Sequence, residues 1–429
     1  MESIVIKQVR ILDPTSAHHG QVRDLHIING KIEAIDSHIK AAASTKTLEA
    51  EGSCLSPGWM DLQAHFFDPG AEHKEGLENG ASAAAHGGFT RTILNASPLV
   101  RPDEKSAIAF LQSHSESFNC TLHPMACVSQ KGEGKSLSEM RDLAKAGAIA
   151  FSDDAPINDT EMLRRALEYS EGMTPPVIST PIDLGLNSGA MMHEGATSTH
   201  MGITGNPSES EIMRIQRDLT ILRYTGGKIH FSVISSAKSV DLIRTAKAEG
   251  LEVTCATTAN HLRFIDEDLH DFDGTLKVMP PFRGKEDREA LRTGVLDGTI
   301  DAVVSDHRPE DLEHHDVEFN ATAFGIASIE STFAVTLDSL KKASSKEALS
   351  ATIRALTQGP RAVLGLPPVN ISTGSDAELT WFHPELTWTD QGATRGENIP
   401  QDIRQNPGNI KGNPLGTIRG NRLFLRATK

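Results

Sequence analysis

The chain contains the stretch Asp61-Leu62-Gln63-Ala64-His65-Phe66-Phe67-Asp68-Pro69-Gly70, which ends in a proline–glycine turn. Alternate residues of a strand point to the same face, so the side chains of Gln63 and His65 are expected to share one pocket at a strand end. Two histidines at this spacing would hold a metal ion. A glutamine amide carries no charge and binds zinc poorly beside an imidazole, so the pair predicts a site with half of its metal-binding chemistry removed.

Length and charge limit the class of protein. The 429 residues suffice for one large α/β barrel and a small accessory domain. The formal net charge of -15, without a block of consecutive Lys and Arg, argues against nucleic acid and against a membrane surface as partners. The start of the chain lacks the pattern of a signal peptide, which predicts a cytoplasmic protein. The cysteines form no CxxC pair and are expected to be reduced and structural; they are Cys54, Cys120, Cys127 and Cys255.

From Leu55 onward, apolar strand patterns alternate with helical patterns, which predicts eight strand–helix units. This is typical of a (β/α)8 TIM barrel in the α/β class, with the active site at the C-terminal ends of the strands. The predicted strands end near Asp61, Asn95, Val128, Asp153, Thr180, Ser235, Asn260 and Asp306. The predicted helices are 75–86, 102–115, 136–146, 159–171, 208–225, 239–249 and 285–297.

Both ends of the chain show alternating apolar and polar residues with turn signals, as in 3–7, 24–32, 377–382 and 417–425. We expect these strands to pair into one small β-sandwich beside the barrel. The predicted organisation is therefore residues 1–54 and 367–429 in the β-sandwich and 55–366 in the barrel. Residues 389–413, which are rich in Gly, Asn, Gln and Pro, are predicted to form an extended loop.

A set of motifs in a fixed order indicates a family. The chain resembles bacterial dihydroorotases of the amidohydrolase superfamily from about residue 50 to residue 335. The resemblance implies the barrel fold, one or two zinc ions at its mouth, and an aspartate after the last strand that moves protons while the cyclic amide of dihydroorotate opens. The motifs are 61–65, 68–70, 72–75, 87–90, 151–154, 193–195, 225–230, 277–283 and 297–301.

Mapped onto the family pattern, the metal site is divided. The resemblance implies that three ligand positions are retained: His65, the strand 4 carboxylate at Asp153 or Asp154, and Asp306, which would also be the general acid and base. It implies that three are lost, because histidines are replaced by Gln63, Thr180 and Val233. We expect no resident cofactor, although the retained residues leave a weak mononuclear zinc site open.

The substrate positions have changed as well. Where the family places an arginine and a histidine to hold the substrate carboxylate, this chain has Phe67 and Glu310, while the third contact, Asn95, is present. The resemblance thus implies that the charge-assisted grip is lost and that a carboxylate would be repelled.

The same residues, and several other histidines, also allow simpler structural roles. Asp153 and Asp306 could cap the helices that follow them, but their coincidence with ligand positions favours a relict site. His230 and His261 are expected to pack or hydrogen-bond near strand ends, since neither occupies a ligand position. His314 and His315 are expected in a solvated acidic loop.

The concerted loss of ligands and of the anion grip predicts a dihydroorotase homologue without catalysis, whose fold is kept for assembly. The resemblance extends to inactive family members that act as structural partners of aspartate transcarbamoylase, and a homo-oligomer is expected. Two alternatives stay open. One is an active cyclic amidohydrolase with a mononuclear site, and the other is a non-catalytic pyrimidine-binding protein.

Overall fold

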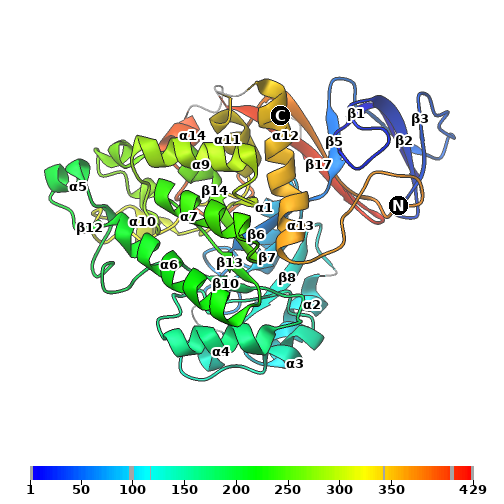
Figure 1. The fold of residues 1–429 in the computed structure, drawn as a ribbon. Coiled ribbons are helices and arrows are strands. Elements are labelled where there is room, and N and C mark those ends of the chain that lie inside the picture. The colour runs from blue at the N-terminus through cyan, green and yellow to red at the C-terminus, as the bar shows by residue number, and fades with distance from the viewer. Residues whose placement is uncertain (1–2, 96–100, 116, 342–343, 406–409, 427–429) are drawn as a thin grey trace.

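The computed structural model describes residues 3–95, 101–115, 117–341, 344–405 and 410–426. Eight of its strands are parallel and neighbour one another in sequence order, surrounded by helices (Figure 1). The predicted (β/α)8 barrel is confirmed. Its strands are β6 (Trp59–Ala64), β7 (Phe89–Leu94), β8 (Thr121–Ala126), β9 (Ala150–Phe151), β10 (Val177–Ser179), β13 (Ile229–Phe231), β14 (Val253–Thr258) and β15 (Ala302–Val304).

The barrel closes where β6 meets the end of β15. Ala64 forms a parallel bridge with His307, and the amide of His65 donates to the carbonyl of His307 at 2.8 Å. Three residues before Ala64 in β6, the carboxylate of Asp61 accepts a hydrogen bond from the amide of Ser305 at 3.0 Å. The first and last strands are therefore joined at the end of the barrel where the candidate residues lie.

The seven predicted helices are confirmed within a few residues. They are α1 (Leu77–His86), α2 (Lys105–Ser115), α3 (Met140–Lys145), α4 (Thr160–Ser170), α6 (Ser208–Thr225), α7 (Ala237–Ala248) and α9 (Lys285–Asp297). Local signals fix their ends: the Asp159 carboxylate, for example, accepts from the amides of Glu161 and Met162 at the start of α4.

Other helices were not predicted. Seven of the eight residues of α11 are buried, so its sequence has no amphipathic period to read. The remaining described helices and strands are η1 (Gln130–Gly132), β11 (Met192–His193), α5 (Ala196–Met201), β12 (Gly205–Asn206), α8 (Ala259–Arg263), η2 (Asp266–Leu269), η3 (Gly274–Leu276), α10 (Leu312–His315), α11 (Thr332–Ser339), α12 (Ser345–Leu356), α13 (Gln358–Val363) and α14 (Gln401–Gln405).

The two ends of the chain form one additional sheet, as predicted. Its order is β18-β17-β16-β5-β1-β2-β3, with β4 paired to β1, and β16 joins the two ends by pairing antiparallel with β5. Its strands are β1 (Ser3–Ile11), β2 (Val22–Ile28), β3 (Lys31–Asp36), β4 (Lys46–Glu49), β5 (Cys54–Pro57), β16 (Glu378–Thr387), β17 (Lys411–Arg419) and β18 (Arg422–Leu425).

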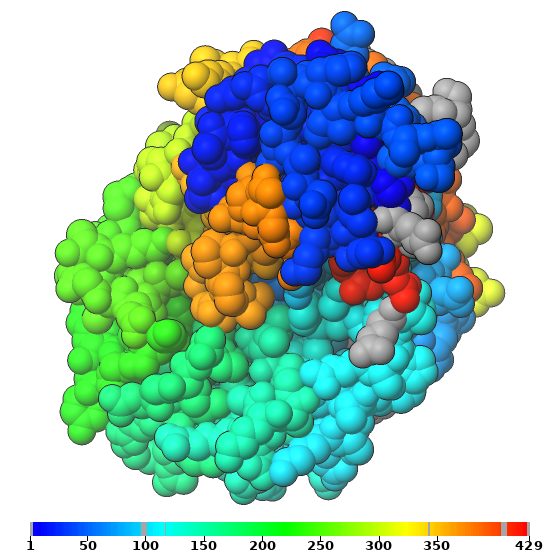
Figure 2. Space-filling view, turned by 90° about the vertical axis from the view of Figure 1, so that its right-hand side faces the viewer, coloured from blue at the N-terminus to red at the C-terminus, as the bar shows by residue number. Residues whose placement is uncertain are grey.

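This sheet has its own apolar core, which includes Ile6, Leu25 and Leu379, while a separate cluster with Met60 and Ile93 fills the barrel interior. The segment that follows α13 lies against the N-terminal strands, where it appears in orange beside blue in Figure 2. There the amide of Ile371 donates to Asp13 at 2.7 Å. The proposed domain boundaries stay a prediction.

The loop predicted over residues 389–413 is wrong at its C-terminal end. Within it, α14 forms and β17 begins at Lys411, while residues 406–409 lie outside the described part of the chain. Ile403 and Ile410 are fully buried in the main core together with Trp388. Burial of these side chains outweighs the turn-forming composition of the segment.

All four cysteines are buried and unpaired, which agrees with their predicted structural role. Among the described helices, none combines the length and the apolar character that crossing a membrane requires.

Candidate functional site

The candidate site lies at the barrel mouth, where β6, β7, β9 and β15 end. Gln63 lies within β6 and points its side chain across the mouth, so that its amide nitrogen donates to Oδ1 of Asp306 at 2.7 Å. Asp306 follows β15 and has a φ of 45°, a left-handed conformation that is costly for a residue with a Cβ. The backbone therefore turns at this point to bring the Asp306 carboxylate to the strand 1 position.

The two candidate aspartates after β9 have different surroundings. The carboxylate of Asp153 accepts from the amide of Ser129 at 3.0 Å and from its hydroxyl at 2.6 Å, so it is used within the loop structure. Asp154, with a φ of 50°, turns its carboxylate into the mouth, where Oδ1 accepts from Nδ2 of Asn95 at 2.8 Å. Of the two, Asp154 faces the site.

Arg308 lies between the retained carboxylates, and sequence reasoning missed it. Its Nε lies 3.3 Å from Oδ1 of Asp306, and its Nη2 lies 3.5 Å from Oδ1 of Asp154. The signal was its position two residues after Asp306, which places both side chains on one side of the chain. Burial acts to lower the pKa of Arg308, but the two carboxylates outweigh it and raise the pKa, so the guanidinium stays charged.

The same cation affects His65, which is buried. Its Nε2 lies 3.7 Å from Oδ1 of Asp154 and has no hydrogen-bond partner among the described residues. Burial, and after it the nearby Arg308, hold the pKa of His65 well below its usual range, so the imidazole is neutral. Burial raises the pKa of Asp154 even though Arg308 and Asn95 act to lower it.

The lost ligand positions leave little space at the mouth. Val233 is buried and packs with the apolar residues of the barrel interior. Together with Thr180, Gln63 and Arg308 it borders a cavity of about 40 Å³. A water molecule needs roughly 10–15 Å³ of such space and a ligand pocket about 300 Å³ or more, so this space is too small for a ring-sized ligand.

The former anion-grip positions are linked by Lys74, which sequence reasoning also missed. Its Nζ lies 2.6 Å from Oε2 of Glu310 and 4.9 Å from the ring centroid of Phe67. The ring of Phe67 in turn stacks on His65 with centroids 5.7 Å apart. The charge of Glu310 is therefore compensated within the protein by a residue of the loop before α1.

A larger cavity, of about 450 Å³, opens beside the mouth. Phe67 and Phe110 give it aromatic walls, and His65, Asn95 and Arg101 also border it. The buried Oδ1 of Asn95 and Nε2 of His65 have no hydrogen-bond partner among the described residues. The cavity therefore has apolar walls and is bordered by two residues that each have a buried polar atom without a described partner.

The other histidines considered in the sequence lie away from the mouth. Nδ1 of His230 pairs with the hydroxyl of Thr254 at 2.8 Å, and both ring nitrogens of His261 are hydrogen-bonded, to Thr258 and to the carbonyl of Pro280. Both are buried, as expected of packed histidines. His314 lies beside Asp311 at the surface in α10.

The residues present do not fit a zinc ion. No group of three or more His, Cys, Asp or Glu side chains converges on a metal position within the described ranges. His65, Asp154 and Asp306 surround the guanidinium of Arg308, and Asp306 also accepts from the amide of Gln63. A divalent ion would have to displace or repel this built-in cation.

Comparisons with known proteins decide the family. A family model described as dihydro-orotase-like matches residues 52–239. The dihydroorotase of Syntrophus aciditrophicus is 36% identical over 403 residues, which cover 92% of this chain and 94% of the relative. The dihydroorotase of Pelobacter propionicus is 33% identical and covers 99% of this chain and 100% of the relative.

The chain belongs to the dihydroorotase family.

Solved structures of more distant proteins share the fold of this family member. An L-hydantoinase (dihydropyrimidinase) from Arthrobacter aurescens superimposes with a TM-score of 0.80 at 19% identity, covering 100% of this chain and 97% of that one. A dihydropyrimidinase from Brevibacillus agri gives a TM-score of 0.79 at 19% identity over 99% and 95% of the two chains. These matches establish the amidohydrolase barrel with its additional sheet.

Proposed function

We propose that this dihydroorotase homologue is catalytically inactive and acts as a structural partner of aspartate transcarbamoylase, itself assembling as a homo-oligomer. The proposed absence of catalysis is supported by the position of Arg308. Its guanidinium pairs with Asp154 and Asp306, the two carboxylates that face the mouth. A fixed organic cation compensates their charge but has no open coordination position, so it cannot generate a hydroxide from bound water.

The substrate positions support the same conclusion. A carboxylate of dihydroorotate would meet Glu310 and Phe67 in place of two cationic groups. The one nearby ammonium, that of Lys74, is already paired with Glu310 at 2.6 Å. Neither the water-activating group nor the anion grip that the reaction requires is provided by these side chains.

The proposed role in assembly is supported by the preserved fold. The whole barrel, its closure and the additional sheet persist, although the residues for chemistry have changed. A protein selected for its surface and its stability would retain these features. The partner is taken from the resemblance to inactive family members that support aspartate transcarbamoylase.

Size-exclusion chromatography with light scattering tests the assembly directly. The purified chain and purified aspartate transcarbamoylase from the same organism, mixed at equal concentration, are expected to elute as one complex of larger mass. The chain alone should elute above the mass of a monomer. A double variant, Gln63→Ala with Asp306→Asn, serves as the control, since changes at the mouth should leave the complex intact. Two separate peaks for the wild-type proteins would contradict the proposal.

A second candidate function is binding of a pyrimidine-like ring without turnover. It is favoured by the 450 Å³ cavity, which is bordered by Phe67, Asn95 and His65. A ring could stack on Phe67 while its amide edge bonds Asn95. Thermal shifts with orotate, dihydroorotate and uracil test this, with Asn95→Ala as the control. Equal melting temperatures with and without each ring would reject it.

A further inference from the structure

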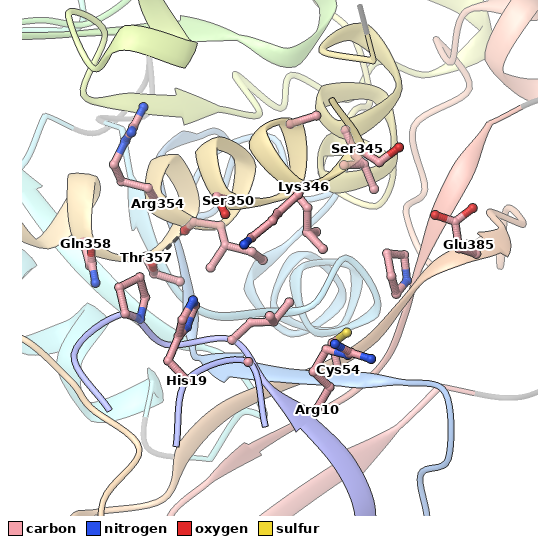
Figure 3. Close-up of a pocket in the computed structure, with 18 of the residues that line it drawn as sticks. Arg10, His19, Cys54, Ser345, Lys346, Ser350, Arg354, Thr357, Gln358 and Glu385 are labelled. Atoms are coloured by element: carbon pink, nitrogen blue, oxygen red, sulfur yellow. Dashed lines mark hydrogen bonds between the residues drawn. The ribbon is translucent and has the colours of Figure 1, made fainter. Parts of the chain in front are cut away.

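A second concave region lies between α12 and the terminal sheet (Figure 3). Its cavity of about 700 Å³ is larger than either cavity at the barrel mouth and shares no lining residue with them. One side is formed by α12, and the other by β1 with the residues after it. We refer to it as the α12 cleft.

The floor of the α12 cleft is apolar. Leu337 and Ile353 are buried, and Leu12 and Leu349 are partly buried at its edge. Such a floor provides contacts for apolar side chains of an occupant.

The walls of the cleft are basic, in a chain whose formal net charge is -15. Among the described residues, neither Arg10 nor Lys346 has a carboxylate partner, and Figure 3 shows Lys346 extending from α12 toward the side on which Arg10 and His19 lie. Arg354 also borders the cleft, but its guanidinium donates to the main-chain carbonyls of Val295 and Leu296 at the end of α9, the latter at 3.2 Å, and Figure 3 shows it pointing away from Arg10. The one acidic residue of the lining, Glu385, is already paired with Lys411 at 3.0 Å.

The length of the cleft indicates the shape of the occupant. Its lining along α12 runs from Ser345 to Arg354, which are nine residues or about 14 Å apart at 1.5 Å per residue. One small anion cannot fill a cleft of this length, whereas an extended chain of about four to six residues spans it.

We propose that the α12 cleft is a docking site for an extended acidic segment of a partner protein, with apolar side chains on the floor and carboxylates facing Arg10 and Lys346. The proposal rests on the proposed function in taking the occupant to be a protein that this chain helps to assemble. Charge complementarity of this kind gives partner selection and a fast, salt-dependent association.

The first test uses a fluorescein-labelled hexapeptide of four glutamates and two leucines, followed by fluorescence anisotropy. The wild-type chain is expected to bind it, more weakly as salt is added. The double variant Arg10→Glu with Lys346→Glu should bind at least about tenfold more weakly, a loss of about 1.4 kcal/mol. The matched control reverses two exposed charges outside the cleft, Lys40→Glu with Lys238→Glu, and should bind like the wild type.

Peptide binding that is absent in the wild type, or equal in the wild type and the cleft variant, would overturn the proposal. Binding that is matched by inorganic phosphate in competition at equal concentration would do the same, because it would indicate a simple anion site. Circular dichroism of both double variants checks that the fold persists, and the neutral variant Lys346→Gln gives a second, milder change that should weaken binding less.

The complex with aspartate transcarbamoylase separates the two proposals. If the wild type forms this complex and the cleft variant does not, while the control does, the docking site is supported. If wild type and cleft variant both form it equally, the docking proposal is overturned and the assembly proposal stands. If the wild type forms no complex, the assembly proposal fails, and the peptide result alone decides on the cleft.

Discussion

The barrel mouth and the seam, where β6 meets the end of β15 and closes the barrel, are built by the same two strands. They differ in how their buried polar groups are paired. Along β6, Asp61 belongs to the seam and Gln63 to the mouth. After β15, Ser305 belongs to the seam, whereas Asp306 and Arg308 belong to the mouth. Residues that are two positions apart on one strand can thus have different roles: one joins the first and last strands, and the other lines the mouth.

At the seam, the buried polar groups are held by one another. Asp61 accepts from both the amide and the hydroxyl of Ser305. Nδ1 of His307 accepts from the amide of Ser328 at 3.1 Å, and its Nε2 faces Glu75 at 3.7 Å. These four side chains are buried. Because an unsatisfied buried group costs more than a bond contributes, none of them can be changed alone without loss of stability.

At the mouth, the groups also compensate one another. Gln63 and Arg308 satisfy Asp306, and Lys74 compensates Glu310. The comparison shows that the same two strands carry a seam held by hydrogen bonds between buried groups and a mouth held by internal ion pairs.

The largest effect is expected at the seam. Asp61→Ala would leave the buried amide of Ser305 without an acceptor and the Ser305 hydroxyl with the Gln63 carbonyl alone, and should lower the free energy of unfolding by about 3 kcal/mol. Burial raises the pKa of Asp61 to about 6, so Asp61→Asn, which keeps one acceptor, should cost clearly less. Urea unfolding at pH 7 measures both. Equal stability of wild type and Asp61→Ala would show that the seam does not carry the fold.

The second largest effect is expected from the pH dependence of stability that His65 contributes at the mouth. Its pKa in the folded protein is depressed, so below about pH 6.5 the unfolded chain binds more protons and stability falls as pH falls. From pH 7 to pH 5 the wild type should lose up to about 2 kcal/mol that the His65→Asn variant does not lose. Both proteins contain Asp61 and the other titrating groups, so the pH-dependent contributions of those groups cancel in this difference. A constant difference between the two proteins across this range would contradict a neutral, buried His65.

A smaller effect is expected from the built-in cation. Arg308→Met keeps the length of the side chain but leaves Asp154 and Asp306 without a counter-charge. The Arg308 side chain is 30% exposed, so solvent screens part of the interaction and the loss should be about 1–2 kcal/mol. Thermal unfolding of this variant and of Arg308→Lys, which keeps the charge, measures it. A Met variant as stable as the wild type would remove Arg308 from the account.

The smallest effect is expected at the former anion grip. Lys74→Met should lower the stability by about 1 kcal/mol, because one carboxylate, that of Glu310, loses its counter-charge, whereas Arg308→Met removes the counter-charge of two. The double variant Lys74→Met with Glu310→Gln should recover most of this loss. A double-variant cycle with no coupling between the two positions would show that they do not compensate each other.

The sequence predicted the barrel well because buried parallel strands are apolar runs that alternate with amphipathic helices. Strand ends converge at one edge of a barrel, and the structure places Gln63, Asp154 and Asp306 there, while the roles predicted for them stay a prediction. It could not decide between Asp153 and Asp154, because that choice depends on the left-handed backbone at Asp154.

Arg308 and Lys74 escaped prediction for a different reason. Both are long side chains whose ends lie several bonds from the backbone, so their partners depend on rotamers and on packing between distant segments. Lys74 meets Glu310 across 236 positions of sequence, and no local pattern records such a pair.

We propose that Arg308 occupies the place of a catalytic metal ion. The test is the zinc content of the purified chain by mass spectrometry after dialysis against excess zinc, with dihydroorotate hydrolysis assayed on the same sample. We expect far less than one zinc per chain and no turnover above background. One zinc per chain with zinc-dependent hydrolysis would refute this proposal, and would mean that His65, Asp154 and Asp306 bind a catalytic metal in spite of Arg308.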